Sequence, residues 1–341
     1  MWRVALLLVV VGLGGPACGQ TGGPAFLTAA GQQVYQRYLN FNLPRALAVS
    51  PAGGYGAYGG VGTIEAARDK AMQSCAAKTP SGCALYAENL ETVWPSARRP
   101  PPPPAPAAPL ITGPGYNFIA DARYIWHGPA AARGMYVWSD GYGGPVSDAR
   151  GVQPQSHVRA FNNAGFDVVR FERDPHQDHQ RDLMAANLAA GLTALRRQGW
   201  KVIVAGGQSR GAWNSLQTLA APGVADVVIA VSPGAHGTDS GNMVTRQETD
   251  LWQLLHDARS PTTRVAFVQF ADDPYSAMPE RRVALVDAQL RPRVGQVLVI
   301  DRPAGITGHG GGASYAFAAR YGDCLVHFAT DASPPSACGA P

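Results

Sequence analysis

Residues 207–211 read GQSRG, a serine between two glycines. In a chain with 40 glycines this pattern carries little weight alone, so its surroundings decide how it is interpreted. The apolar run KVIVAGG before it predicts a strand, and GAWNSLQTLAA after it predicts a helix. A serine at such a strand-to-helix turn is presented at the end of a sheet, where its hydroxyl can attack an acyl carbonyl. We therefore predict that Ser209 is a nucleophile.

The neighbours of Ser209 fit the same turn. Glycine is expected at 207 and 211, because a side chain two residues either way would collide with the adjoining strand or helix. The N–H of Arg210 opens the predicted helix and is expected to donate to a developing oxyanion.

A serine hydroxyl needs a base, and His236, His256, His309 and His327 follow it in the chain. His256 lies in a helical pattern, and His327 lies in CLVHFA, which we predict to be a strand. His236 follows a predicted strand in the loop SPGAHG and could line the rim of the site. His309 lies in the glycine-rich loop GITGHGGGAS after the last predicted strand, and it is the predicted base.

The base is in turn oriented by an acid, for which the chain offers Asp272, Asp273 and Asp301. The first two come just past the end of a predicted strand, and Asp301 ends a strand that leads directly into the His309 loop. Side chains of neighbours leaving a strand point to opposite sides, so one of the first two faces the base. Pro274 biases Asp273 towards an extended backbone, which makes it the predicted acid and turns Asp272 to solvent or to a turn cap.

A second cluster could bind metal. The segment RDPHQDHQRD carries imidazoles and carboxylates that could ligate Zn²⁺, but it contains no H-E-x-x-H pattern. We predict a solvated loop there, and neither a metal nor a cofactor for this protein. The residues concerned are Asp174, His176, Asp178, His179 and Asp182.

Apolar, valine-rich runs alternate with helical stretches over the region after residue 109. This alternation predicts a doubly wound α/β fold with a mostly parallel sheet. The expected strands are GMYVW, DVVRF, KVIVAGG, DVVIAVS, RVAFVQF and QVLVID.

Residues 110–330 resemble an α/β-hydrolase of the dienelactone-hydrolase or prolyl-oligopeptidase-like kind. The matching pieces are YVWSDGYGG, FNNAGFDVVRFERD, GGQSRGAW, FADDPY and GHGG. The resemblance implies that SDGYGG follows the third strand and that the N–H of Tyr142 (or Gly141) is the second oxyanion donor. Two residues depart from the family: Ser209 stands where dienelactone hydrolases carry Cys, and Asp140 stands where His is usual before the oxyanion glycine.

These features together predict an exported serine hydrolase that cleaves an ester through an acyl-enzyme. An ester is expected first because no separate propeller domain accompanies the fold to gate peptides. A peptidase or amidase on the same triad is the enzymatic alternative, and a non-catalytic cell-envelope binding protein on a hydrolase scaffold is the other. The net charge of +4, without a block of Lys or Arg, argues against a nucleic-acid partner.

The first residues predict export. Residues 1–19 combine a charged start, a short apolar run and small residues, which is typical of a secretory signal peptide, and no later segment could span a membrane. The mature protein would be secreted or periplasmic; a lipid anchor on Cys18 is the competing interpretation. Four other cysteines suggest two local disulfides by proximity alone, Cys75–Cys83 and Cys324–Cys338.

The remaining sequence divides at the proline-rich stretch 96–109, which we expect to be an extended polyproline linker. A small α+β module with a strand, a turn, a strand, a helix capped by Thr63 and a further strand is expected over 25–95, as a stabilising or binding appendage. The hydrolase domain is expected over 110–341.

Overall fold

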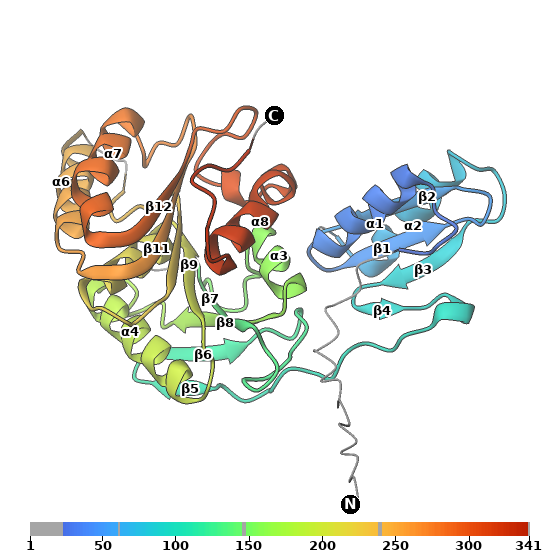
Figure 1. Cartoon of the computed structure of the whole chain (residues 1–341), viewed down its shortest axis with the longest axis horizontal. Helices are drawn as coiled ribbons and strands as arrows, with labels where there is room; N and C mark the ends of the chain where they lie inside the picture. Colours follow the sequence, from blue (N-terminus) through green and yellow to red (C-terminus); the bar gives the residue numbers. More distant parts are fainter. Residues whose placement is uncertain (1–22, 61, 145–147, 238–240, 340–341) are drawn as a thin grey trace, which may run out of the picture.

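A computed structural model describes residues 23–339 except 61, 145–147 and 238–240. The predicted signal peptide and Cys18 lie outside the described residues. The chain forms two sheets, a large one flanked by helices and a small one near the N-terminus (Figure 1).

The large sheet has eight strands in the order β5-β6-β8-β7-β9-β10-β11-β12. From β8 to β12 all neighbours run parallel, whereas β6 pairs antiparallel with both β5 and β8. This strand order, with its second strand reversed, is that of the α/β-hydrolase fold, so the predicted fold class is confirmed. The strands are β5 (Ile111–Gly113), β6 (Tyr116–Ala120), β7 (Gly134–Ser139), β8 (Phe166–Arg173), β9 (Ile203–Gln208), β10 (Val227–Val231), β11 (Ser260–Gln269) and β12 (Val294–Asp301).

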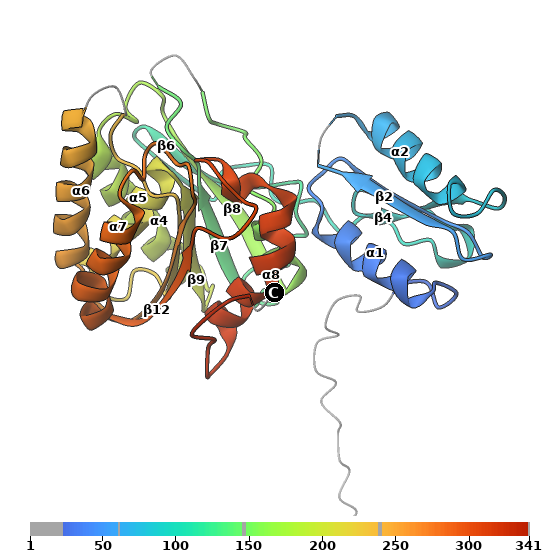
Figure 2. The same cartoon turned by 90° about the horizontal axis from the view of Figure 1, so that it is seen from above.

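Helices cover both faces of the large sheet (Figure 2). One hydrophobic cluster joins the sheet to α4, α5 and α6, and a second joins its other face to α3 and α8. Strands buried on both faces need apolar residues at successive positions, which is why β7 and β10 read as continuous apolar runs and are buried throughout. The helices are α3 (His157–Asn163), α4 (Arg181–Arg197), α5 (Arg210–Gln217), α6 (Gly241–His256), α7 (Pro279–Leu285) and α8 (Tyr315–Thr330).

The small sheet is antiparallel, in the order β2-β1-β3-β4, and lies between two helices (Figure 2). Alternate residues of β1 face opposite helices: Leu47 and Val49 pack in the cluster of α1, and Ala46 and Ala48 in that of α2. Thr63 caps α2 through its side chain, as predicted. The elements are α1 (Ala29–Asn40), β1 (Arg45–Val49), β2 (Tyr55–Gly59), α2 (Ile64–Ala76), β3 (Ala84–Glu88) and β4 (Glu91–Thr92).

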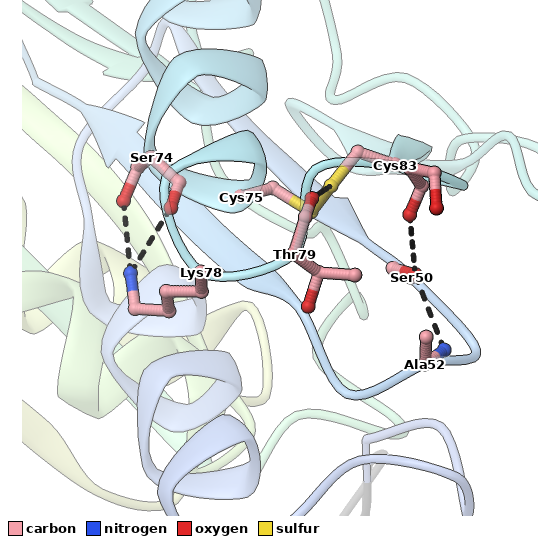
Figure 3. Close-up of a disulfide and its surroundings, with 8 residues drawn as sticks. Ser50, Ala52, Ser74, Cys75, Lys78, Thr79 and Cys83 are labelled. Carbon is pink, nitrogen blue, oxygen red and sulfur yellow. Dashed lines mark hydrogen bonds between the residues drawn. A yellow bond between two sulfur atoms is a disulfide. The ribbon is translucent and has the colours of Figure 1, made fainter.

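Both predicted disulfides are present. Cys75–Cys83 ties the end of α2 to the start of β3 (Figure 3), and Cys324–Cys338 ties α8 to the C-terminal segment. Each closes a short loop, with sequence separations of 8 and 14. No helix in the described part of the chain is both long and apolar enough to cross a bilayer.

The sequence missed α1 and the hairpin β5–β6, and it was wrong about His327. That residue lies on α8 and is exposed, because the buried apolar run around it belongs to a helix and not to a strand. Short apolar runs do not by themselves distinguish a buried helix from a strand. In the proline-rich stretch, Arg99 makes one β-bridge with Thr92, and residues 100–109 form neither helix nor strand.

The turn after α1 contacts α8 and the segment before α3. Phe41 packs edge-on against Tyr315 at the start of α8, with ring centroids 4.7 Å apart. Leu43 exchanges two hydrogen bonds with the Gln153 side chain, of 3.3 and 3.1 Å. Asn42 donates to the carbonyl of Pro154 at 3.1 Å. These bonds hold the segment before α3 against the turn that follows α1.

Candidate active site

Ser209 lies at the turn between β9 and α5, in a backbone conformation that non-glycine residues rarely adopt. Its φ is 52° and its ψ is −116°. Such strain is held only where the surroundings fix it. Here the Ser209 N–H donates to the Val231 carbonyl at 3.0 Å, while the Ser209 carbonyl accepts from Trp213 and Gly234 at 3.0 and 3.2 Å. The backbone of Ser209 is thereby fixed at the carboxyl end of the sheet, and its Oγ lies near Gly234.

The two flanking glycines are required by the close approach of this turn to β7. A Cβ on Gly211 would lie 1.9 Å from the Ser139 carbonyl oxygen. A Cβ on Gly207 would lie 2.5 Å from the backbone of Gly211 and 2.6 Å from the same oxygen. The expected collision on both sides of Ser209 is therefore confirmed.

His309 and Asp273 form an oriented pair beside this turn. The imidazole Nδ1 of His309 lies 2.9 and 3.0 Å from the two carboxylate oxygens of Asp273. The Asp273 side chain is fully buried, whereas that of His309 is 21% exposed. A buried carboxylate on Nδ1 favours the tautomer with its proton there, leaving Nε2 free to accept one. The Gln208 side chain, next to Ser209, donates to the His309 carbonyl at 3.2 Å and links the two loops.

Short backbone contacts join the loop of His309 to the acid loop, which follows β11 and carries Asp273. The Gly308 N–H donates to the Ala271 carbonyl at 2.7 Å, and Ala271 pairs in parallel with Thr307. Within the acid loop, Asp273 Oδ1 also accepts from the Tyr275 N–H at 2.9 Å. The Tyr275 ring then packs on the His309 ring, with centroids 4.2 Å apart. The imidazole is thus held by a carboxylate at one edge and by an aromatic ring at its face.

The other candidate acids lie elsewhere. Asp272 is exposed and has φ +56°, so its side chain turns away from the buried Asp273. Asp301 accepts from the Gln269 side chain at 2.7 Å and pairs with Arg302. Burial alone would raise the pKa of Asp301, but the bonds from Arg302 and Gln269 together outweigh it, so the pKa is lowered. Neither contacts His309 in any described interaction.

The other candidate bases have partners of their own. His236 Nε2 lies 2.6 Å from the Asp250 carboxylate, to which Arg181 also donates at 3.3 Å. Burial lowers the pKa of His236. His256 ends α6, as its helical pattern predicts, and stacks on Trp252.

The loop after β7 approaches the nucleophile from the opposite side. A Cβ on Gly141 would lie 3.4 Å from the Ser209 Cβ. Arg173, at the end of β8, donates to the carbonyls of Asp140 and Gly141 at 2.8 and 3.0 Å. In a trans peptide the N–H points opposite to the carbonyl, so the amides of Gly141 and Tyr142 both point away from Arg173. Both remain candidates for the second oxyanion donor.

The Arg210 side chain contacts this loop and two others, those of Asp178 and Ala235. Its buried guanidinium donates to the carbonyls of Asp178 and Ala235, each at 2.9 Å, and lies 5.0 Å from the Tyr142 ring centroid. Burial lowers the pKa of Arg210 to about 10, so the group stays charged at neutral pH. Asp140 is half-buried, and desolvation raises its pKa.

Three positioning residues escaped the sequence analysis. Gln247 on α6 accepts from the backbone N–H groups of Ala235 and His236 at 2.8 and 2.9 Å, and its amide donates to the Tyr275 carbonyl. The fully buried pair formed by Arg282 and Glu248 lies alongside. Arg282 donates to Glu248 at 2.7 Å, to the Tyr275 carbonyl at 2.7 Å and to the Pro233 carbonyl at 3.1 Å. The acid loop is therefore clamped from below.

In the segment that could have bound zinc, Asp178 has a structural role. Asp178 forms a buried ion pair with Arg173 at 2.7 Å, and its carbonyl accepts from Arg210. The residues that the structure describes include no group of three or more His, Cys, Asp or Glu side chains that could hold a metal ion. Asp178 thus holds the arginine that orients the loop after β7.

Comparison with known proteins finds no matching family model and no matching curated sequence. Solved structures that match include a puromycin-hydrolysing peptidase of Mycobacterium tuberculosis, at 13% identity and TM-score 0.44, over 62% of this chain and 37% of that one. The Pyrococcus furiosus esterase Pf2001 matches at 14% identity and TM-score 0.43, over 63% and 87% of the two chains. Est1E from Butyrivibrio proteoclasticus matches at 15% and 0.43, over 62% and 93%.

Proposed function

We propose that this protein is a serine hydrolase that cleaves an ester through an acyl-enzyme. The observation that carries the proposal is the strained Ser209 at the β9–α5 turn, beside a histidine oriented by a buried carboxylate. Strain in the backbone, a nucleophilic side chain and an oriented base at one sheet end are hallmarks of an activated serine. The Ser, Asp, His order along the chain also suits this fold.

In the proposed mechanism, Ser209 Oγ attacks the acyl carbonyl while His309 Nε2 takes its proton. Asp273 accepts the Nδ1–H bond and stabilises the imidazolium that forms. His309 then returns the proton to the leaving alcohol, which departs and leaves an ester on Ser209. Water, deprotonated by the same imidazole, attacks that ester; the bond to Ser209 then breaks, the acid is released and the proton returns to Ser209 Oγ.

The oxyanion of each tetrahedral intermediate would be held by backbone amides. The Arg210 N–H, at the first residue of α5, is one proposed donor, and the N–H of Tyr142 or Gly141 is the other. The carbonyl-to-Arg173 bonds support this assignment, because they fix the orientation of both amides before substrate arrives. Preorganised donors of this kind lower the barrier without reorganising during the reaction.

Ser209→Ala tests the proposal. The variant should fold and should lose the hydrolysis of p-nitrophenyl acetate, whereas Ser215→Ala should retain it. Ser215 is a buried serine on α5, the helix that follows Ser209, and among the described residues its hydroxyl donates to the Gly211 carbonyl of the same helix at 2.9 Å. Comparing p-nitrophenyl acetate with the corresponding p-nitroanilide separates an esterase from an amidase. Full turnover by Ser209→Ala would remove the proposed nucleophile.

We further propose that residues 25–95 form a separate module, 96–109 a linker and 110–341 the hydrolase domain. The two sheets, each with its own hydrophobic clusters, support this division. We also propose a secreted or periplasmic location. Two disulfides support it, since such bonds persist in oxidising compartments. Mass mapping of the mature N-terminus would test the cleavage after residue 19 and the alternative lipid anchor.

A further inference from the structure

A hollow of about 360 Å³ lies in the small N-terminal sheet, far in sequence from Ser209. It opens between α1 and α2, with β2 as its floor. A volume of this size falls in the range of ligand sites. Its lining includes Arg37, Phe41, Tyr55, Ala57, Ser74 and Lys78.

The floor of the hollow is a sheet edge. Among the described strands, β2 is the outermost and pairs only with β1, and Figure 2 looks down on it with a helix to either side. At the ends of this pair, the Ser50 N–H donates to the Gly54 carbonyl and the Gly60 N–H to the Pro44 carbonyl. Hydrogen bonding alternates along an antiparallel pair, so the even-numbered residues of β2 face β1. The backbone N–H and C=O groups of Tyr55, Ala57 and Gly59 therefore point outward from the sheet.

The walls of the hollow carry positive charge. Lys78 lies 4.7 Å from the Tyr55 ring centroid and donates to the carbonyl and hydroxyl of Ser74, so it keeps one N–H for a ligand (Figure 3). Arg37, on the opposite wall, is exposed and makes no hydrogen bond or ion pair with the described residues. No carboxylate is among the residues that line the hollow. An anionic ligand would meet two cations and no repulsion.

We propose that this hollow binds an extended acidic peptide, which adds as a strand to β2. The peptide backbone would pair with the outward groups of Tyr55, Ala57 and Gly59, and its carboxylates would approach Arg37 and Lys78. Strand addition to an exposed edge takes its affinity from main-chain bonds and its selectivity from the flanking side chains. A second copy of the chain fits less well, because it would bring its own Arg37 and Lys78 against the same two cations.

The test uses the full mature chain and a fluorescein-labelled octapeptide, Glu-Glu-Val-Val repeated twice. Binding is followed by fluorescence anisotropy in about 50 mM salt, where screening is modest. Two matched peptides serve as controls: one has Lys for every Glu, and one is N-methylated at alternate residues, which removes backbone donors. Only the unmodified acidic peptide should bind.

Two variants test the site itself. Reversing both cations in Arg37→Glu/Lys78→Glu should weaken binding at least about tenfold, whereas the charge-matched Arg197→Glu/Lys201→Glu, at the exposed end of α4, should not. Ala57→Pro removes one outward N–H and leaves the bonds to β1 intact, as proline is tolerated on an edge strand. It should weaken binding to a similar degree while the melting temperature and ester hydrolysis are kept.

Several results would overturn the proposal. Equal binding of the N-methylated peptide would mean charge attraction without strand addition. Equal binding of the lysine peptide would refute the charge argument. Undiminished binding by Ala57→Pro would show that the edge is not used. A dimer in solution that Ala57→Pro dissociates would assign the edge to a second copy.

Discussion

Replacing Asp273 by Asn isolates what the carboxylate contributes. Its Oδ1 already accepts from the Tyr275 N–H at 2.9 Å, and an Asn keeps that bond with its own oxygen. The amide nitrogen then takes the place of Oδ2, 3.0 Å from His309 Nδ1. An amide can only donate there, so the imidazole proton moves to Nε2, the atom that must accept from Ser209.

The size of the effect follows from that tautomer. The wrong tautomer in a triad reduces kcat by about 10⁴, which corresponds to roughly 5.5 kcal/mol of barrier. KM should change little, because Asp273 is buried beneath the imidazole and is not expected to touch substrate. The loop should persist, since its backbone bonds and the Arg282 clamp are untouched.

The assay is steady-state hydrolysis of p-nitrophenyl acetate, with Asp272→Asn as the matched control. Asp272 is exposed and has φ +56°, a conformation that Asn adopts readily, so this variant should keep wild-type turnover. If Asp272→Asn loses activity and Asp273→Asn keeps it, the two roles are reversed. If neither variant matters, the acid is another residue, and Asp301 is the next to test.

Three further predictions address the supports of the site. Arg173→Lys keeps the charge beside Asp178, but its single nitrogen cannot reach Asp178, Ser139 and both carbonyls at once, so kcat should fall about 10²-fold at unchanged KM; an unchanged kcat would separate Arg173 from the oxyanion loop. Burial lowers the pKa of His157 from 6.5 to about 3, so its contribution to the free energy of unfolding is complete above pH 6.5 and falls by about 1.4 kcal/mol per unit towards pH 3. His157→Gln should flatten this part of the pH dependence in urea denaturation, and an unaltered slope would contradict it. Replacing Cys324 and Cys338 by serine should lower the free energy of unfolding by about 3 kcal/mol, and a loss near zero would show that the bond stabilises nothing.

Much of the fold could be predicted because its signals are local. The strand-to-helix turn around Ser209 is visible as an apolar run, a small-residue turn and a helical pattern in sequence. The hairpin β5–β6 was missed although it has a comparable local signal: Gly113, Pro114 and Gly115 mark a turn between two short apolar runs. The helix α1 is harder, because polar residues interrupt its apolar face and its buried side chains are few.

The supports of the site could not be predicted, because they depend on pairings between distant segments. Arg282 and Glu248 read as ordinary charges on two helices, yet they form a fully buried pair beneath the acid loop. Arg173 reads as the charged end of a strand, and only the fold brings it to the carbonyls of Asp140 and Gly141. Nothing in the spacing of these residues distinguishes them from a solvated surface.

The central claim is that Ser209 is an activated nucleophile. Treating the mature protein with a fluorophosphonate and mapping the adduct by peptide mass spectrometry tests it directly. We predict one phosphonylated residue, Ser209, with labelling slowed by several orders of magnitude in His309→Ala, because the hydroxyl then lacks its base. An unlabelled protein, or a label on any other serine, would contradict the account.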